Sequence, residues 1–269
     1  MADFLETMAA SSAARAEAAR RGSRAAGSDK PLARLELGAF DVIAEIKDRS
    51  PAEGELAGAD SDRAEQARRY AAGGAAAISV LTEPTRFAGR LAHLEEVVAA
   101  VPGVPVMRKD FLVDPVQVVE ARDAGASGVL LIATMLADAS LGDMLDCAAD
   151  HGMFVLLESF DAADLERTRR LLDEPRHADR AAAGELLVGV NTRNLRTLEV
   201  DNQRLEKLAP LLPAARCVAE SGLKTPEDAG RAAELGYRLA LVGTALMRSG
   251  DPAALIAGMR DAGGAAVAA

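Results

Sequence analysis

Short apolar runs alternate with amphipathic segments along most of the chain. Eight of these runs have the length and composition of buried strands. They span residues 41–46, 76–81, 104–107, 128–132, 154–157, 187–190, 217–219 and 239–242. Segments with helical periodicity lie between them, for example at 62–72, 115–124, 139–151, 162–172, 204–212, 226–235 and 252–259. One strand run and its helix together occupy roughly 25 to 35 residues, the size of a βα unit.

Strands that alternate with helices predict parallel pairing and right-handed crossovers. Eight such units close most simply into a (β/α)8 TIM barrel of the α/β class. A doubly wound open sheet is the alternative, but it usually carries a glycine-rich turn after its first strand, and this sequence has none. The length of 269 residues suits a single barrel domain over 1–269.

Several helix starts carry cap signals. Asp114 precedes Pro115, and Thr225 precedes Pro226 with an acid three residues after the cap. Asp161 and Asp201 are further candidate caps. Residues 2–22 predict an additional helix before the barrel, and 21–30 a linker. We expect a surface loop at 173–185 and a frayed tail at 263–269.

Composition narrows the possible partners. The chain is 49% hydrophobic but only 3% aromatic, so aliphatic residues must build the core. A net charge of −10 argues against a nucleic-acid surface, yet a locally positive pocket can still bind an anionic small molecule. Cys147 and Cys217 have no metal-ligand spacing, which predicts buried thiols and no metal site. Without a secretory signal or membrane-spanning run, we expect a cytoplasmic protein with no membrane contact.

Polar residues gather where the predicted strands end. The active site of a barrel lies at this carboxyl end, and Glu45 and Lys47 are two positions apart, hence on one face. The set comprises Glu45, Lys47, Lys109, Glu158, Asn191 and Glu220. Buried charges are costly unless paired, so a ring of ion pairs that only stabilises the barrel is the alternative to catalysis.

The last two strand ends predict a phosphate site. Gly222, Gly243 and Thr244 follow strands seven and eight, where barrels bind phosphate through backbone N–H groups and a short helix, here expected at 245–248. Glycine allows the backbone to approach phosphate oxygens closely. The alternative is that these glycines serve only as turns.

The charge pair after the third strand has two roles. Lys109 should point into the barrel mouth, and Arg108 should point to the opposite face as a structural ion-pair partner. A lysine close to a second lysine in a partly dry pocket should have a lowered pKa.

Seven segments together resemble the indole-3-glycerol phosphate synthase family. The match runs in order from about residue 42 to 252 through VIAEIKDRSPAEG, SVLTEPTRFAG, PVMRKDFLVDPVQVVEARDAGASGVLLI, LLESF, LVGVNTRNL, AESGLKTPEDA and ALVGTALM. The predicted first helix resembles the extra segment of this family, which implies that 1–38 form a helical extension capping the barrel. The resemblance also implies a phosphorylated small-molecule substrate, no cofactor, and a monomer, with a dimer as the alternative.

The resemblance implies a reaction in tryptophan biosynthesis. The enzyme closes a ring in 1-(2-carboxyphenylamino)-1-deoxyribulose 5-phosphate, expels carbon dioxide and removes water. By motif position, Lys109 is the acid of ring closure, Glu158 serves dehydration with Lys47 nearby, and Glu45 orients Lys47. Which lysine donates at which step stays open. Asn191 holds a substrate hydroxyl, supported by Glu220. The remaining implied substrate contacts are Ser50, Phe87, Phe111, Leu131, Arg193 and Ser221.

Four positions depart from the family pattern. Asp48 and Glu53 stand where basic residues are usual, Arg90 replaces a small polar residue, and Thr192 replaces asparagine. None belongs to the implied catalytic set, although the first two could weaken attraction of an anionic substrate.

Three other functions compete with synthase activity. A catalytically reduced paralogue that binds a phosphorylated ligand would not need the intact polar set. A phosphosugar isomerase would require a cysteine/aspartate pair, which the strand ends lack. A Schiff-base aldolase could use Lys109 to form an imine, which borohydride would trap.

Overall fold

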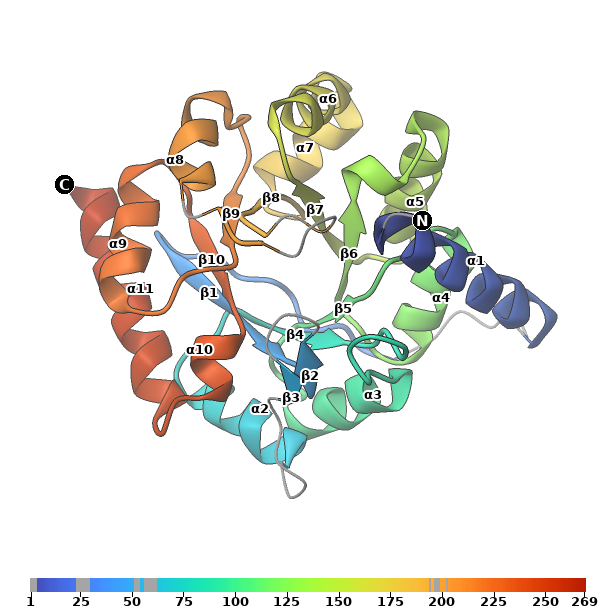
Figure 1. The fold of residues 1–269 in the computed structure, drawn as a ribbon, viewed down its shortest axis with the longest axis horizontal. Helices are drawn as coiled ribbons and strands as arrows, with labels where there is room; N and C mark the ends of the chain where they lie inside the picture. The colour runs from blue at the N-terminus through green and yellow to red at the C-terminus, as the bar shows by residue number, and fades with distance from the viewer. Residues whose placement is uncertain are drawn as a thin grey trace.

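The computed structural model describes residues 4–22, 30–50, 54–55, 62–193, 195, 199–201 and 203–269. Within this part, eight parallel strands close into a barrel in the order β1-β10-β9-β8-β7-β6-β5-β4, and Figure 1 shows helices around them. The strands are β1 (Asp41–Ile46), β4 (Ala77–Leu81), β5 (Val106–Lys109), β6 (Gly128–Ile132), β7 (Phe154–Ser159), β8 (Leu186–Asn191), β9 (Cys217–Glu220) and β10 (Leu239–Val242). The predicted (β/α)8 barrel is confirmed, and the open sheet is wrong because β1 pairs with both β4 and β10.

The helices follow the predicted alternation. They are α1 (Phe4–Gly22), α2 (Arg63–Ala72), α3 (Leu91–Ala100), α4 (Pro115–Asp123), α5 (Asp138–Asp150), α6 (Ala162–Leu172), α7 (Pro175–Ala182), α8 (Arg204–Leu208), α9 (Pro226–Glu234), α10 (Thr244–Met247) and α11 (Pro252–Ala268). Two short 3-10 turns, η1 (Ala133–Met135) and η2 (Ala209–Leu211), and a hairpin of β2 (Arg49–Ser50) and β3 (Gly54–Glu55) complete the described elements.

Cap residues define most helix starts. Thr225 forms a capping box with Asp228, and the side chains of Asp114 and Asp161 each accept a backbone hydrogen bond from the first turn. Asp201 is not a cap, because α8 begins after Gln203. The Asp201 carboxylate instead accepts from the Gln203 backbone N–H at 3.0 Å.

Two predicted irregular segments are helical. The expected loop at 173–185 contains α7, which buries His177 and Ala181 against the barrel. The expected frayed tail continues α11 to Ala268. A Cβ at Gly263 would lie 2.3 Å from the Phe40 ring, so this part of the helix packs closely on the barrel. Tertiary packing therefore orders both segments. Most of the expected linker at 21–30 lies outside the described residues.

Strand side chains alternate between two apolar layers. One cluster fills the barrel interior and includes Ile43, Met107 and Leu130; the other lies between strands and helices and includes Val42, Val106 and Leu131. Because alternate positions share a face, Lys109 lies on the inner face with Met107. This alternation decides which side chains reach the mouth of the barrel.

Helix α1 packs beside the carboxyl ends of β5 and β6. Leu5 and Met8 are buried in the same cluster as Phe111 and Ile132, and the Phe4 ring meets Phe111 edge-on at 5.9 Å. Figure 1 shows α1, in dark blue, next to α4. The grouping of 1–38 as a capping extension of a single 1–269 domain stays a prediction, since residues 1–3 and 23–29 lie outside the described chain.

Candidate active site

A cavity of about 1060 Å³ opens at the carboxyl ends of the strands. Most of the predicted site residues line it: Glu45, Lys47, Ser50, Phe87, Lys109, Asn191, Arg193, Glu220, Ser221, Gly222, Gly243 and Thr244. Glu158, Phe111 and Leu131 do not. The barrel therefore brings together side chains that are up to about 200 positions apart in the sequence.

Two lysines and two glutamates form an ion-pair chain across the inner face of the barrel. Lys47 Nζ lies 2.7 Å from one carboxylate oxygen of Glu45, and Lys109 Nζ lies 3.5 Å from the other. Lys109 Nζ also lies 4.0 Å from Glu158 Oε2. The Glu158 side chain is 1% exposed and that of Lys109 17%, so opposite charges compensate one another in a nearly dry site.

The carboxylates hold Lys109 in its charged form. Burial alone would lower the pKa of Lys109, but Glu45, Glu158 and Glu220 outweigh it and raise the pKa above its ordinary value. The expected lowering by a neighbouring lysine is therefore wrong for Lys109, because its nearest charged partners are acids. A protonated ammonium can donate a proton, which suits an acid rather than a nucleophile.

The pKa values of the buried Glu45 and Glu220 are shifted in opposite directions. Burial would raise the pKa of Glu45, but Lys47 and Lys109 lower it below its ordinary value. Burial raises the pKa of Glu220 well above the ordinary value, and the neighbouring Glu158 carboxylate raises it further. Two like charges close together cannot both form readily. The Glu158 carboxylate therefore favours the protonated form of Glu220.

Asn191 and Ser221 form a second polar group at the ends of β8 and β9. The Ser221 hydroxyl donates to Asn191 Oδ1 at 2.8 Å, and the Arg193 backbone N–H donates to the same oxygen at 2.9 Å. Ser221 has a φ of 66° and Gly222 one of 84°. A serine in the left-handed region is uncommon, and such backbone strain is concentrated at functional sites.

Thr192, one of the departures from the family pattern, connects these two strands. Its backbone N–H donates to Glu220 O at 3.0 Å, and its hydroxyl donates to Ser221 O at 3.1 Å. Threonine therefore supports the conformation of residues 220–221 at this position.

The predicted phosphate residues line the cavity together with the first residues of α10. Gly243 directly precedes α10, and a Cβ there would lie 2.4 Å from Glu45 Oε1 and 2.8 Å from Lys47 Nζ. Any side chain at this position would therefore have to displace the Glu45–Lys47 ion pair. Arg248, at the C-cap of α10, also lines the cavity, although it was not predicted as a site residue.

Phe87 lines the cavity and Phe111 packs against it, and these two rings form the aromatic wall, without Leu131. The rings of Phe87 and Phe111 lie 6.2 Å apart. The prediction for Leu131 is wrong, because that side chain lies in the strand–helix layer, whereas Leu130 and Ile132 lie with Phe111 in the barrel interior. Ile132 is the register partner of Glu158 on the neighbouring strand. Ile132, and with it Leu130 two positions earlier, therefore shares the inner face with Glu158, and Leu131 does not.

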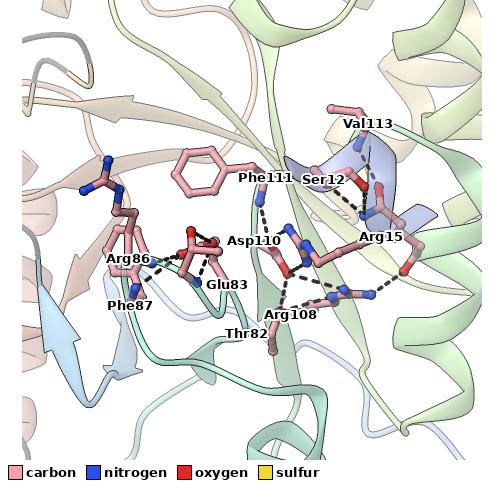
Figure 2. Close-up of polar contacts among 12 residues, drawn as sticks. Ser12, Arg15, Thr82, Glu83, Arg86, Phe87, Arg108, Asp110, Phe111 and Val113 are labelled. Carbon is pink, nitrogen blue, oxygen red and sulfur yellow. Dashed lines mark hydrogen bonds and ion pairs between the residues drawn. The ribbon is translucent and has the colours of Figure 1, made fainter. Parts of the chain in front are cut away.

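The buried carboxylate of Asp110, next to Lys109, was not predicted as a site residue. Asp110 accepts two hydrogen bonds from Arg15 on α1, both at 2.8 Å, and one from Thr82 at 2.7 Å (Figure 2). As predicted, Arg108 points away from the cavity; it contacts Asp110 at 3.3 Å and donates to Gln117 O at 2.9 Å. No local sequence signal links Arg15 to a residue 95 positions away.

Asp48, the acidic departure in the first loop, is charge-compensated. Its carboxylate pairs with Arg63 at the start of α2 and lies 3.6 Å from His93 Nδ1 on α3. Asp48 therefore ties the segment after Lys47 to two helices. Arg90 occupies the cap position of α3 without a side-chain cap hydrogen bond, and Glu53 lies outside the described residues.

Other kinds of site find little support in the described ranges. Within them, no group of three histidine, cysteine or acidic side chains could hold a metal ion, and no helix has the length and apolar character needed to cross a bilayer. Both cysteines are free thiols. Cys217 is buried as predicted and burial raises its pKa to about 12, whereas Cys147 is only half-buried, and burial raises its pKa as well. Neither is a reactive thiolate at neutral pH.

The family model described as indole-3-glycerol phosphate synthase matches residues 24–259. The chain belongs to the indole-3-glycerol phosphate synthase family. An indole-3-glycerol phosphate synthase from Nocardioides sp. is 48% identical over 223 residues, which cover 82% of this chain and 80% of the relative. One from Methanopyrus kandleri is 46% identical over 226 residues, covering 82% and 83% of the two chains.

Another relative in the indole-3-glycerol phosphate synthase family matches a longer part of the chain. A synthase of this name from Mycolicibacterium gilvum is 42% identical over 249 residues, covering 92% of this chain and 86% of the relative. Among solved structures, a 3-hexulose-6-phosphate synthase from Salmonella typhimurium has a TM-score of 0.62 at 17% identity, covering 83% of this chain and 98% of its own. That likeness supports the barrel fold alone.

Proposed function

We propose that the half-buried Lys109 ammonium is the acid of ring closure in a chain that acts as an indole-3-glycerol-phosphate synthase, a carboxy-lyase of tryptophan biosynthesis. The activity follows from the family match over nearly the whole barrel. The observation that carries the role of Lys109 is its position in the cavity with acidic neighbours that keep it protonated.

Ring closure requires a proton at the ketose oxygen. The ring carbon that carries the carboxylate of 1-(2-carboxyphenylamino)-1-deoxyribulose 5-phosphate attacks the ketose carbon, and a new carbon–carbon bond forms. The carbonyl electron pair moves to oxygen, which takes a proton from Lys109 and becomes a hydroxyl. Breaking the bond to the carboxylate then releases carbon dioxide and returns its electron pair to the ring.

Dehydration requires an acid and a base. The hydroxyl leaves with a proton as water, and the intermediate loses a proton to give the indole. We assign Glu158 to this step, with Lys47 nearby, because Glu158 is buried within 4.0 Å of Lys109. Glu45 orients both lysines through its two carboxylate oxygens. General acid–base catalysis of this kind contributes about 10²–10⁴-fold.

The remaining residues would bind the substrate. Asn191 would contact a substrate hydroxyl, held in place by Ser221 and supported by Glu220. The phosphate would lie near Gly222, Gly243 and Thr244, all of which line the cavity. The aromatic ring would lie against Phe87 and Phe111, with Ser50 and Arg193 at the edge of the cavity. These assignments need no metal or organic cofactor.

The direct test is turnover. Purified protein with the carboxyphenylamino substrate should produce the fluorescence of the indole product, and dialysis against a chelator should leave the rate unchanged. Absence of that fluorescence would overturn the proposed function. Borohydride added with substrate should trap no adduct on Lys109; a covalent adduct would support the aldolase alternative. We also propose that the protein is cytoplasmic and monomeric. Light scattering after gel filtration measures its oligomeric state.

A further inference from the structure

The connection between β4 and α3 is folded around one buried carboxylate, that of Glu83. Glu83 is 1% exposed and lies two residues after the end of β4. Its Oε1 accepts from the backbone N–H and hydroxyl of Thr85, at 2.8 and 2.5 Å. Its Oε2 accepts from the backbone N–H groups of Arg86 and Phe87, at 2.7 and 3.2 Å. Four donors thus converge on one side chain.

The backbone of this connection is closed on itself as well. The Gly89 N–H donates to Glu83 O at 2.8 Å, and Ala88 has a φ of 54°. A Cβ at Gly89 would lie 2.4 Å from Leu81 O, so the segment returns tightly to the strand that it leaves. Its conformation is therefore set by local bonds, of which those to Glu83 are the most numerous.

The segment presents Phe87 to the cavity, with the Phe111 ring packed against it at 6.2 Å. A second carboxylate acts on Phe111 in the same way, because Asp110 Oδ1 accepts from the Phe111 backbone N–H at 2.8 Å. Figure 2 shows the two phenylalanines with Glu83 and Asp110 beside them. Each ring of the aromatic wall is thus held through its own backbone N–H by a buried acid at a strand end.

We propose that Glu83 is a positioning residue for the aromatic wall: its carboxylate sets the spacing of Phe87 from Phe111 and hence the fit of the substrate's carboxyphenyl ring. The inference rests on the proposed function. A carboxylate is required because only its two oxygens can accept from all four donors. In glutamine, the amide nitrogen would face two of these four donors and accept from neither.

Glu83→Gln tests this role with almost no change in volume. We expect the KM for the carboxyphenylamino substrate to rise about 10-fold, since losing one to two hydrogen bonds corresponds to about 1.4 kcal/mol. The kcat should change less than about twofold, because Lys109 and Glu158 are untouched. The inhibition constant of inorganic phosphate should not change. An equal rise in the phosphate constant, or an unchanged KM, would show that Glu83 does not act on the ring.

A double-mutant cycle separates positioning from general destabilisation. In a Phe87→Leu background, Glu83→Gln should raise KM by less than about twofold, because the side chain that it positions is gone. Independent, multiplicative effects would reject the inference. If Glu83→Gln does not fold, Thr85→Val carries the test: it removes only the hydroxyl donor, and we expect KM to rise about threefold with the phosphate constant unchanged.

Failure of the inference can be told from failure of the proposed function. Wild-type protein without product fluorescence contradicts the function, whereas an active wild type with an unaffected variant contradicts only the role of Glu83. Binding of 2-aminobenzoate, followed by its own fluorescence, tests the wall without turnover. Weaker binding to Glu83→Gln than to wild type supports the inference, and equal binding opposes it.

Discussion

Lys109 shows how neighbouring charges define one side chain's chemistry. Position alone allows it to be an acid, a nucleophile or a structural cation. Its contact with Glu45 at 3.5 Å and with Glu158 at 4.0 Å favours the charged ammonium, the form that donates a proton. An imine-forming lysine needs the opposite, a lowered pKa.

Replacing Lys109 with alanine should abolish ring closure. We expect kcat to fall about 10³-fold, within the range typical of a lost general acid, while phosphate still inhibits or binds. Stopped-flow fluorescence of the indole product measures the rate. Lys207→Ala is the control, because Lys207 is 60% exposed on α8 and pairs with Asp201. Near-normal turnover of Lys109→Ala would overturn the assignment.

Replacing Glu158 with glutamine should slow dehydration more than substrate binding. The amide keeps the size of the side chain but cannot exchange a proton, so we expect about a 10²-fold lower rate of product formation. Carbon dioxide release in a single turnover should precede indole formation by a measurable interval. Equal rates of the two events, both close to those of the wild type, would count against this role.

Gly243 offers a test of the ion pair that does not remove a charge. Alanine there would place a Cβ 2.4 Å from Glu45 Oε1 and 2.8 Å from Lys47 Nζ, and both atoms are ends of side chains that can move. We therefore expect a loss of activity of at least about 10-fold, with a free energy of unfolding within about 1 kcal/mol of wild type. Urea denaturation and turnover measure the two effects.

Gly250→Ala is the matched control for Gly243→Ala. A Cβ at Gly250 would meet no heavy atom within 4 Å, so neither activity nor stability should change appreciably. If both glycine variants lost activity equally, displacement of the Glu45–Lys47 pair would not be the cause.

Among the elements, α1 is attached by contacts of very different value. Arg15 reaches the fully buried Asp110, whereas Arg20 reaches Asp114 with a side chain that is 63% exposed. Arg108 still faces Asp110 when Arg15 is removed, so the loss is smaller than for an isolated buried charge. Exposed pairs contribute little because water and salt screen them.

Arg15→Ala should lower the free energy of unfolding by about 2–3 kcal/mol, since it leaves Asp110 partly uncompensated. Arg20→Ala, on the same helix, should lower it by at most about 1 kcal/mol. Urea denaturation followed by circular dichroism measures both. Equal effects of the two substitutions would mean that Asp110 does not depend on α1.

The sequence predicted elements best where local chemistry decides the structure. Apolar runs gave the strand boundaries to within two residues, and Thr225 gave the start of α9, because both signals are local. The helix at 175–182 and the continuation of α11 were missed, because packing on the barrel rather than local composition orders them. Leu131 was misplaced because motif matching does not determine which face of a strand a residue occupies.

The site residues, too, were predictable only where the geometry of the barrel alone determines their positions. Residues at strand ends, such as Lys109 and Asn191, converge because barrel geometry places all strand ends together. The contacts of Asp110 and Glu83 were not predictable, since they depend on how α1 and the β4–α3 connection pack. Pairing across 95 positions leaves no local pattern in one sequence.

For the whole molecule, buried acids give stability two opposing dependences on pH. Burial would raise the pKa of Asp110, but Arg15 and Arg108 lower it, and Glu45 is likewise lowered. Their stabilisation is present above the unfolded pKa, about 4, and is lost as pH falls through the folded values. Glu220 has a raised pKa, so its contribution is lost as pH rises from about 4.5 through its folded value.

We expect Glu220→Gln to be more stable than wild type at pH 8 but not at pH 4. Glutamine cannot ionise, so the variant does not lose stability when pH rises through the folded pKa of Glu220. The difference in free energy of unfolding, from urea titrations across this interval, should widen with pH. Glu166→Gln on the exposed side of α6 should show no such trend. A constant difference between Glu220→Gln and wild type would contradict the raised pKa.

Closure of the barrel has a consequence for how a ribosome makes the protein. Strand β1 pairs on one side with β4 and on the other with β10, joining Asp41 to Leu239. During synthesis, one edge of β1 therefore has no native partner until almost the last helix is made. All six residues of β1 are buried in the finished barrel and four of them are apolar, so the unpaired edge of this strand can pair with other chains. Nascent chains that stop before residue 239 should be the species most prone to aggregate and most in need of a chaperone.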